Sequence, residues 1–122
     1  ISNTIANHEI VKNFNNQTVI IFSKKGYFYE KVFNSNFKKL IFFTENKKMI
    51  KKLSLSSNIT TYLVKYPKKS LDNFFYQNIK KNLKNIFLDN KYAYLISVIF
   101  PRKNSRANSL SIVEKKDFIL KR

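Results

Sequence analysis

The sequence has no cysteine, one histidine (His8) and one glycine (Gly26), and each scarcity argues against a class of site. Without cysteine there is neither a disulfide framework nor a thiolate metal site. A chain with one glycine cannot form a glycine-rich phosphate loop. His8 has only Glu9 beside it, and the seven acidic residues are scattered singly, so no acid–base pair or metal cluster is indicated. We expect no enzyme activity, no metal, no cofactor and no small-molecule substrate.

Long hydrophobic runs are also missing. The longest, residues 92–100, contains Ser97 and is too short to cross a bilayer, so we expect no transmembrane segment. No signal-peptide pattern is visible at the N-terminus. Because the chain begins with Ile1 rather than methionine, we expect its true start to be missing.

Acidic residues are few, whereas basic residues are abundant. There are 24 Lys and Arg against 7 Asp and Glu, giving a net charge of +17. The preference for Lys over Arg, together with abundant Asn, Phe, Ile and Tyr, indicates an A/T-rich gene, but that bias does not explain the scarcity of acidic residues. Self-repulsion at this charge destabilises a compact state unless a polyanion relieves it. With 43% hydrophobic residues the chain still has enough apolar side chains for a core, so the composition predicts a folded RNA-binding protein.

The first half of the chain has the pattern of β-strands. Residues 18–22 are a β-branched run, residues 23–26 contain the only glycine, and residues 27–33 alternate, which predicts a β-hairpin with its tip at 23–26. The lone glycine is expected at positive φ. Further strands are predicted at 40–44, 49–55 and 59–66. Because the connections are short, we expect an antiparallel meander.

The period changes after Pro67. Apolar residues at three- and four-residue steps predict one main helix within 71–89, with Ser70 as N-cap and Asp72 in the first turn. The residues expected to be buried on this helix are Phe75, Ile79, Leu83 and Ile86. Residues 92–100 follow as a strand buried on both faces, and short strands are expected around 110–112 and 118–120.

The fold class predicted from these elements is α+β: an antiparallel β-sheet meander packed against one main amphipathic helix, with a basic C-terminal tail. We divide the chain into an N-terminal extension (1–16), an α+β RNA-binding core (17–100) and the tail (101–122). The predicted RNA contacts lie at the hairpin tip, at both ends of the helix and in the tail. They are Lys24, Lys25, Lys68, Lys69, Lys80, Lys84, Arg102, Lys103, Arg106, Lys121 and Arg122.

Two groups among these contacts have a specific reason. Lys68 and Lys69 oppose the helix macrodipole, which is unfavourable unless phosphate lies nearby. Arg102 and Arg106 are two of only three arginines in a chain that otherwise uses lysine, and the planar guanidinium suits bidentate phosphate contact.

A family resemblance rests on residues 18–28, where a strand runs into a turn and a second strand. Lys25, Gly26 and Phe28 match the turn of large-subunit ribosomal protein six, while Ser23 and Lys24 replace its Gly-Pro. Residues 102–122 resemble the family's basic C-terminal loop and last strand, without its Tyr-Lys-Gly-Lys-Gly. Family members hold two tandem α+β repeats and are longer, so one repeat is eroded here or the chain is a fragment.

The resemblance implies a structural constituent of the large ribosomal subunit that binds ribosomal RNA and neighbouring ribosomal proteins. A/T-rich coding points to a mitochondrion or other organelle, with the cytoplasm of an A/T-rich organism as the alternative. Two other interpretations stay open: another organellar ribosomal or ribonucleoprotein subunit, and a basic non-enzymatic interaction domain that binds an acidic or anionic-membrane partner.

Overall fold

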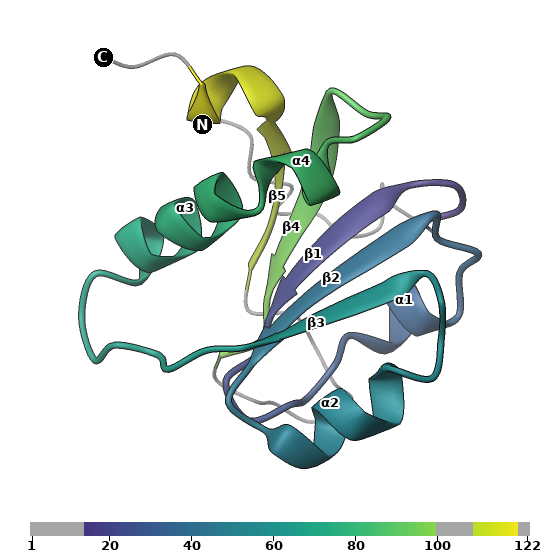
Figure 1. Ribbon diagram of the computed structural model, residues 1–122, viewed down its shortest axis with the longest axis vertical. Helices are drawn as coiled ribbons and strands as arrows, with labels where there is room; N and C mark the ends of the chain where they lie inside the picture. Colours follow the sequence, from purple (N-terminus) through teal and green to yellow (C-terminus); the bar gives the residue numbers. More distant parts are fainter. Residues whose placement is uncertain (1–13, 100–108, 120–122) are drawn as a thin grey trace.

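A five-stranded mixed sheet forms the centre of the protein (Figure 1). The computed structural model describes residues 14–99 and 109–119. The strands are β1 (Thr18–Phe22), β2 (Lys39–Thr44), β3 (Ile59–Leu63), β4 (Tyr92–Ser97) and β5 (Ser109–Glu114). The helices are α1 (Glu30–Phe33), α2 (Lys47–Leu53), α3 (Leu71–Lys81), α4 (Leu83–Ile86) and the 3-10 helix η2 (Lys115–Phe118).

The sheet order is β3-β2-β1-β4-β5, and the α+β class predicted from the sequence is confirmed. The antiparallel meander, however, is not formed. Strand β1 pairs in parallel with β2 and with β4, β2 pairs in parallel with β3, and only the β4–β5 pair is antiparallel. Parallel neighbours require crossover connections, and helices occupy those connections here.

The predicted hairpin at 18–33 is therefore wrong, although its first strand is confirmed as β1. After β1 the chain turns at 23–26, where the Gly26 N–H donates to the Ser23 carbonyl at 3.3 Å, and then leaves the sheet to form α1. Gly26 has the expected positive φ, at 93°. A Cβ at this position would lie 2.7 Å from Met49 Cγ and 2.9 Å from Asn46 Nδ2, so glycine is required where the turn meets the start of α2.

The predicted strand at 49–55 is also wrong, because this segment belongs to α2. Asn46 Oδ1 accepts hydrogen bonds from the N–H groups of Lys48 (3.0 Å) and Met49 (3.2 Å), which caps the helix. Leu53, four residues after Met49, is buried against the sheet. The cap and the i, i+4 apolar pair outweigh the strand propensity of this segment.

The helix predicted within 71–89 is confirmed, but it breaks at Asn82 into α3 and α4. Ile79 and Ile86 are buried as expected, whereas Phe75 and Leu83 are partly buried. Ser70 precedes the helix at φ 61° and makes no side-chain cap hydrogen bond, contrary to the expectation.

The last predicted elements are confirmed in part. Residues 92–97 and 109–114 form β4 and β5. Of the strand expected at 118–120, the two described residues, 118 and 119, are not in a strand. Instead η2 ends at Phe118, whose ring stacks on Tyr76 at 5.0 Å and lies 6.1 Å from Phe87, so the turn brings this aromatic residue onto the α3 side of the sheet.

Both faces of the sheet are covered. Val19, Ile21 and Phe42 face α1 and α2, whereas Ile20 and Phe22 face α3 and α4. Figure 1 shows α3 and α4 on the opposite side of the sheet from α1 and α2. All five residues of β1 are therefore buried, as is typical of a central parallel strand.

This topology creates a switch point between β1 and β4. The chain runs from β1 to β2 to β3 on one side, and α3 then carries it back across the other face to β4, on the far side of β1. In open parallel sheets, ligands bind in the crevice outside the carboxyl ends of the strands at such a point. Those strand ends are followed by residues 23–26, 64–70 and 98–99.

Candidate functional site

Two loops meet at the carboxyl edge of the sheet: the turn after β1 and the segment after β3. Glu45, just after β2, joins them. Its N–H donates to the Lys24 carbonyl at 3.0 Å, and its Oε2 accepts from the Tyr66 N–H at 2.6 Å. The segment after β3 is thereby held beside the turn after β1.

Tyr66 fixes that segment to the sheet. Its hydroxyl donates to the Phe43 carbonyl at 2.6 Å, and its ring lies edge-on to Phe22 at 6.4 Å and 4.7 Å from Phe74. Burial, reinforced by the negative charge of Glu45, raises the pKa of Tyr66 far above its usual range. The phenol therefore stays protonated and acts as a donor at any physiological pH.

A pocket of about 360 Å³ opens between the two loops. It is lined by Lys24, Lys25, Tyr66, Pro67, Lys68, Leu71 and Ile99. We call it the switch-point pocket. The turn after β1 supplies two of its lysines, the segment after β3 supplies the third, and Ile99, two residues after the end of β4, completes the lining. None of the lining residues is acidic, so three cations share one concave site without a carboxylate among them.

Ser23, the first residue of this turn, adds a second polar feature. Its side chain is fully buried, and Oγ makes no hydrogen bond within the part of the chain that the structure describes. An unsatisfied buried hydroxyl costs about 1–3 kcal/mol. Ser23 Oγ is therefore a buried polar group at this end of the sheet that other protein groups do not satisfy within the described residues.

The structure brings together some of the lysines predicted from the sequence and separates others. Lys24, Lys25 and Lys68 meet in the switch-point pocket. Lys69 lines a neighbouring groove, described below. Lys80 and Lys84 line a different surface hollow of about 340 Å³ where α3 meets α4. Arg102, Lys103, Arg106, Lys121 and Arg122 lie outside the described residues.

At the opposite edge of the sheet, polar side chains are bound to other protein groups. There Lys39 Nζ donates to the Asn85 carbonyl at 2.6 Å and to Asn85 Oδ1 at 3.0 Å. Asn90 Nδ2 donates to Thr18 Oγ1 at 2.6 Å. These polar groups satisfy one another and so stabilise the fold.

Sequence reasoning missed the apolar lining of the pocket, namely Pro67, Leu71 and Ile99, and the anchoring role of Tyr66. The sequence does contain a signal for this site, because the residues that line the pocket follow shortly after predicted apolar strands. In residues 14–99 and 109–119, no three His, Asp or Glu side chains gather into a group that would hold a metal ion. No helix in those same ranges has the length and apolar character to cross a membrane. Compared with known protein families and with curated proteins, the chain matches none.

Proposed function

We propose that this protein binds a nucleotide in the switch-point pocket. The observation that carries the proposal is the pocket itself: three lysines and no acidic residue line a cavity of about 360 Å³ at the topological switch point of a parallel sheet. Cavities of roughly 300–1,000 Å³ are the usual size for small-molecule sites. The volume lies at the small end of that range, which fits a single nucleotide.

The lysines fit the phosphate end of such a ligand. Lys24 is partly buried, so its charge is screened by solvent less than that of an exposed lysine. Lys68 stands three residues before the first residue of α3, at the positive end of the helix dipole. Two positive features placed together are unfavourable by themselves, and a phosphate between them removes the conflict.

The remaining lining fits the other end of the ligand. Pro67, Leu71 and Ile99 provide apolar surface against which a planar base packs. The Tyr66 hydroxyl is already bound to the Phe43 carbonyl, so Tyr66 offers its ring rather than a polar group. In this proposal lysine side chains bind the phosphate, as backbone N–H groups do in a glycine-rich loop.

Titration calorimetry on the purified chain tests this proposal. Nucleoside mono-, di- and triphosphates are expected to bind more tightly than inorganic phosphate, because phosphate lacks the base. The double variant Lys24→Gln/Lys68→Gln is expected to weaken nucleotide binding by about tenfold or more per lysine, from roughly 1.5–3 kcal/mol for each charged hydrogen bond.

Lys51→Gln/Lys52→Gln is the matched control, because it removes the same charge from exposed positions on α2. It should bind nucleotide like the unmodified protein. Equal affinity in the Lys24/Lys68 variant and this control would contradict the proposal, as would the absence of nucleotide binding by the unmodified chain.

A second candidate is the ribosomal role: a constituent of a large ribosomal subunit, in an organelle, that binds ribosomal RNA. It is supported by the net charge of +17 and by helices that lack acidic partners. Helix α2 contains no acidic residue, and α3 and α4 contain only Asp72. The hairpin on which the family resemblance rested is not formed, so this candidate rests on charge.

Ribosomal RNA binding tests this second candidate. Under the ribosomal proposal, affinity should fall steeply with salt and should drop in Lys80→Gln/Lys84→Gln. Saturating mononucleotide should leave it unchanged, because those lysines line a hollow separate from the switch-point pocket. RNA binding that resists both the variant and high salt would rule out this basic surface.

A further inference from the structure

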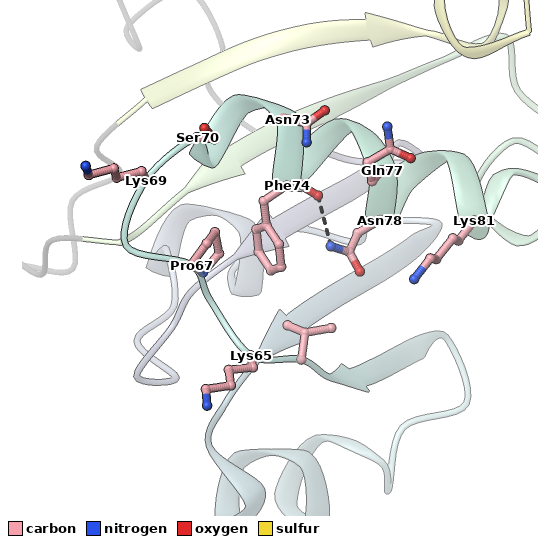
Figure 2. A pocket seen from close by; sticks show the side chains of 10 residues that line it. Lys65, Pro67, Lys69, Ser70, Asn73, Phe74, Gln77, Asn78 and Lys81 are labelled. Carbon is pink, nitrogen blue, oxygen red and sulfur yellow. Dashed lines mark hydrogen bonds between the residues drawn. The ribbon is translucent and has the colours of Figure 1, made fainter.

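A larger groove lies next to the switch-point pocket, on the other side of Pro67. Its volume is about 470 Å³, and Pro67 lines both cavities. Its polar lining includes Lys65, Lys69, Asn73, Gln77, Asn78 and Lys81. Figure 2 shows it between α3 and the segment after β3. We call it the α3 groove.

The chemistry of the α3 groove is basic and amide-rich. Lys65, Lys69 and Lys81 are all exposed, and no acidic residue is among the lining side chains. Lys69 lies just before α3 and Lys81 is its last residue, and the ten helical steps from Leu71 to Lys81 span about 15 Å along the helix axis at 1.5 Å per residue. One phosphate cannot reach both ends of such a groove, whereas a chain of phosphates can.

The amides lie between these cations. Asn73 and Gln77 are exposed and four residues apart, so they share one face of α3. Asn78 Nδ2 donates to the Phe74 carbonyl at 2.9 Å, drawn as a dashed line in Figure 2. That bond fixes the Asn78 side chain and leaves its Oδ1 as an acceptor. Amide side chains pair with the donor and acceptor edges of unpaired bases.

The lysines around Pro67 serve both cavities. Lys65 and Lys69 line the α3 groove, whereas Lys68 lines the switch-point pocket. The phosphates of a nucleic acid strand that passes over Pro67 would therefore lie near lysines in both cavities. Tyr66 holds this crossing point rigidly through its bonds to Phe43 and Glu45. A rigid crossing point lowers the ordering cost of binding an extended ligand.

We propose that the switch-point pocket and the α3 groove form one surface for single-stranded nucleic acid of about four nucleotides, near the lower limit of known single-strand sites. One nucleotide occupies the pocket, and the following phosphates pass over Pro67 into the groove, where the amides meet the bases. This inference rests on the proposed nucleotide pocket. A duplex does not fit, because its bases are paired and cannot enter the pocket.

The experiment measures affinity against oligonucleotide length. Single strands of one to six nucleotides, with one repeated base, are titrated by fluorescence anisotropy at fixed salt. The affinity of the unmodified protein should rise up to about four nucleotides and then level off. In Asn73→Ala/Gln77→Ala, which changes no charge, and in Lys65→Gln/Lys81→Gln, the tetranucleotide should bind about tenfold more weakly, while the mononucleotide binds as before.

The Lys51→Gln/Lys52→Gln control should change neither affinity, and circular dichroism should show all variants folded. Affinity that does not depend on length would overturn the groove proposal while leaving the nucleotide pocket intact. Failure of the mononucleotide to bind the unmodified protein would overturn both. A sulfated oligosaccharide of matched charge serves as a competitor without bases. If it binds as tightly as the tetranucleotide and loses as much affinity in Asn73→Ala/Gln77→Ala, the surface does not recognise nucleic acid and the inference is wrong.

Discussion

The amino and carboxyl ends of the parallel strands, here called the amino edge and the carboxyl edge of the sheet, differ in how their polar side chains are bonded. At the amino edge, Lys39 is bound to Asn85 and Thr18 to Asn90, so these four side chains have protein partners. At the carboxyl edge, Ser23 Oγ is buried with no partner in the described structure, and three lysines line a pocket that contains no acidic residue.

The backbone cannot cause this difference, because the same four parallel strands supply both edges. It comes from the side chains at the strand ends and from the direction in which the crossovers open. Groups that satisfy one another contribute to stability, whereas groups left unsatisfied on a rigid support are suited to bind a ligand. The comparison predicts that variants at the two edges have separable effects on stability and on binding.

The largest expected effect is a loss of stability of the whole sheet, on which both edges depend. Ile79 lies on α3 and is buried among residues of the sheet face, including Ile20 and Ile41. Ile79→Asp places an unpaired charge there and is expected to lower the free energy of unfolding by more than about 4 kcal/mol, with loss of cooperative thermal unfolding. Gln77→Asp, an exposed change of the same charge two residues away, should leave the melting temperature nearly unchanged. A normal melting curve for Ile79→Asp would show that α3 is not packed on the sheet.

A pH titration examines the carboxyl edge alone. Because the pKa of Tyr66 is raised in the folded protein, both the folded and the unfolded chain keep this proton below pH 10, and stability does not depend on it there. Above pH 10 the unfolded chain loses the proton while the folded protein keeps it. Stability should then fall by up to about 1.4 kcal/mol per pH unit from this residue.

Chemical denaturation at pH 9 to 11 measures this loss, and Tyr66→Phe isolates it. Relative to the unmodified protein, the variant should lose less stability between these pH values, because the tyrosine that ionises on unfolding is gone. Tyr27→Phe is the control, since Tyr27 is half exposed. Parallel pH profiles for the unmodified protein and Tyr66→Phe would contradict burial of the phenol.

A smaller effect should be confined to the amino edge. Lys39→Met removes the bonds from Nζ to Asn85 while keeping the aliphatic stem, and should cost about 1 kcal/mol of unfolding free energy without changing nucleotide affinity. Lys38→Met removes an exposed ion pair with Asp89 at 3.4 Å and should cost less than about half of that. If Lys39→Met weakened nucleotide binding as much as the Lys24/Lys68 variant does, the functional separation of the two edges would be lost.

The smallest expected change has the opposite sign. Ser23→Ala removes a buried hydroxyl that has no partner in the described structure, so the free energy of unfolding should rise by about 0.5–1 kcal/mol. Calorimetric melting of the variant beside the unmodified protein measures it. A clear loss of stability would show that Oγ has a partner in solution.

Local sequence patterns predicted where strands lie but not how they pair. The β-branched and aromatic runs at 18–22, 40–44 and 92–97 are strands, as expected. The direction of these strands depends on the crossovers between them. Strand propensity alone predicts a strand at 49–55, whereas Asn46 caps a helix there. The continuous apolar runs of β1 and β2 were themselves typical of strands buried on both faces. Burial on both faces is typical of parallel strands, so this pattern favours parallel pairing at 18–22 and 40–44.

The sequence predicted individual residues of the candidate site, but not that they lie together. Lys24, Lys25 and Lys68 were each expected to contact an anion, from their place in loops and at a helix start. Their meeting could not be predicted, because more than forty residues separate Lys25 from Lys68 and the topology alone brings them together. Ile99 carries no local signal of function, since only the position of β4 beside β1 makes it part of the pocket.

The pairing of β1 with β4 also has a consequence for how the chain is made. Val19 lies opposite Tyr94, so the central strand gains its second neighbour only after roughly 75 further residues have left the ribosome. At about 5–20 residues per second, that interval lasts about 4–15 s. During it, one edge of a strand that is entirely buried in the folded protein has no partner, and such edges promote aggregation. The yield of soluble protein should therefore depend on translation speed across residues 23–91, with slower synthesis prolonging this exposure.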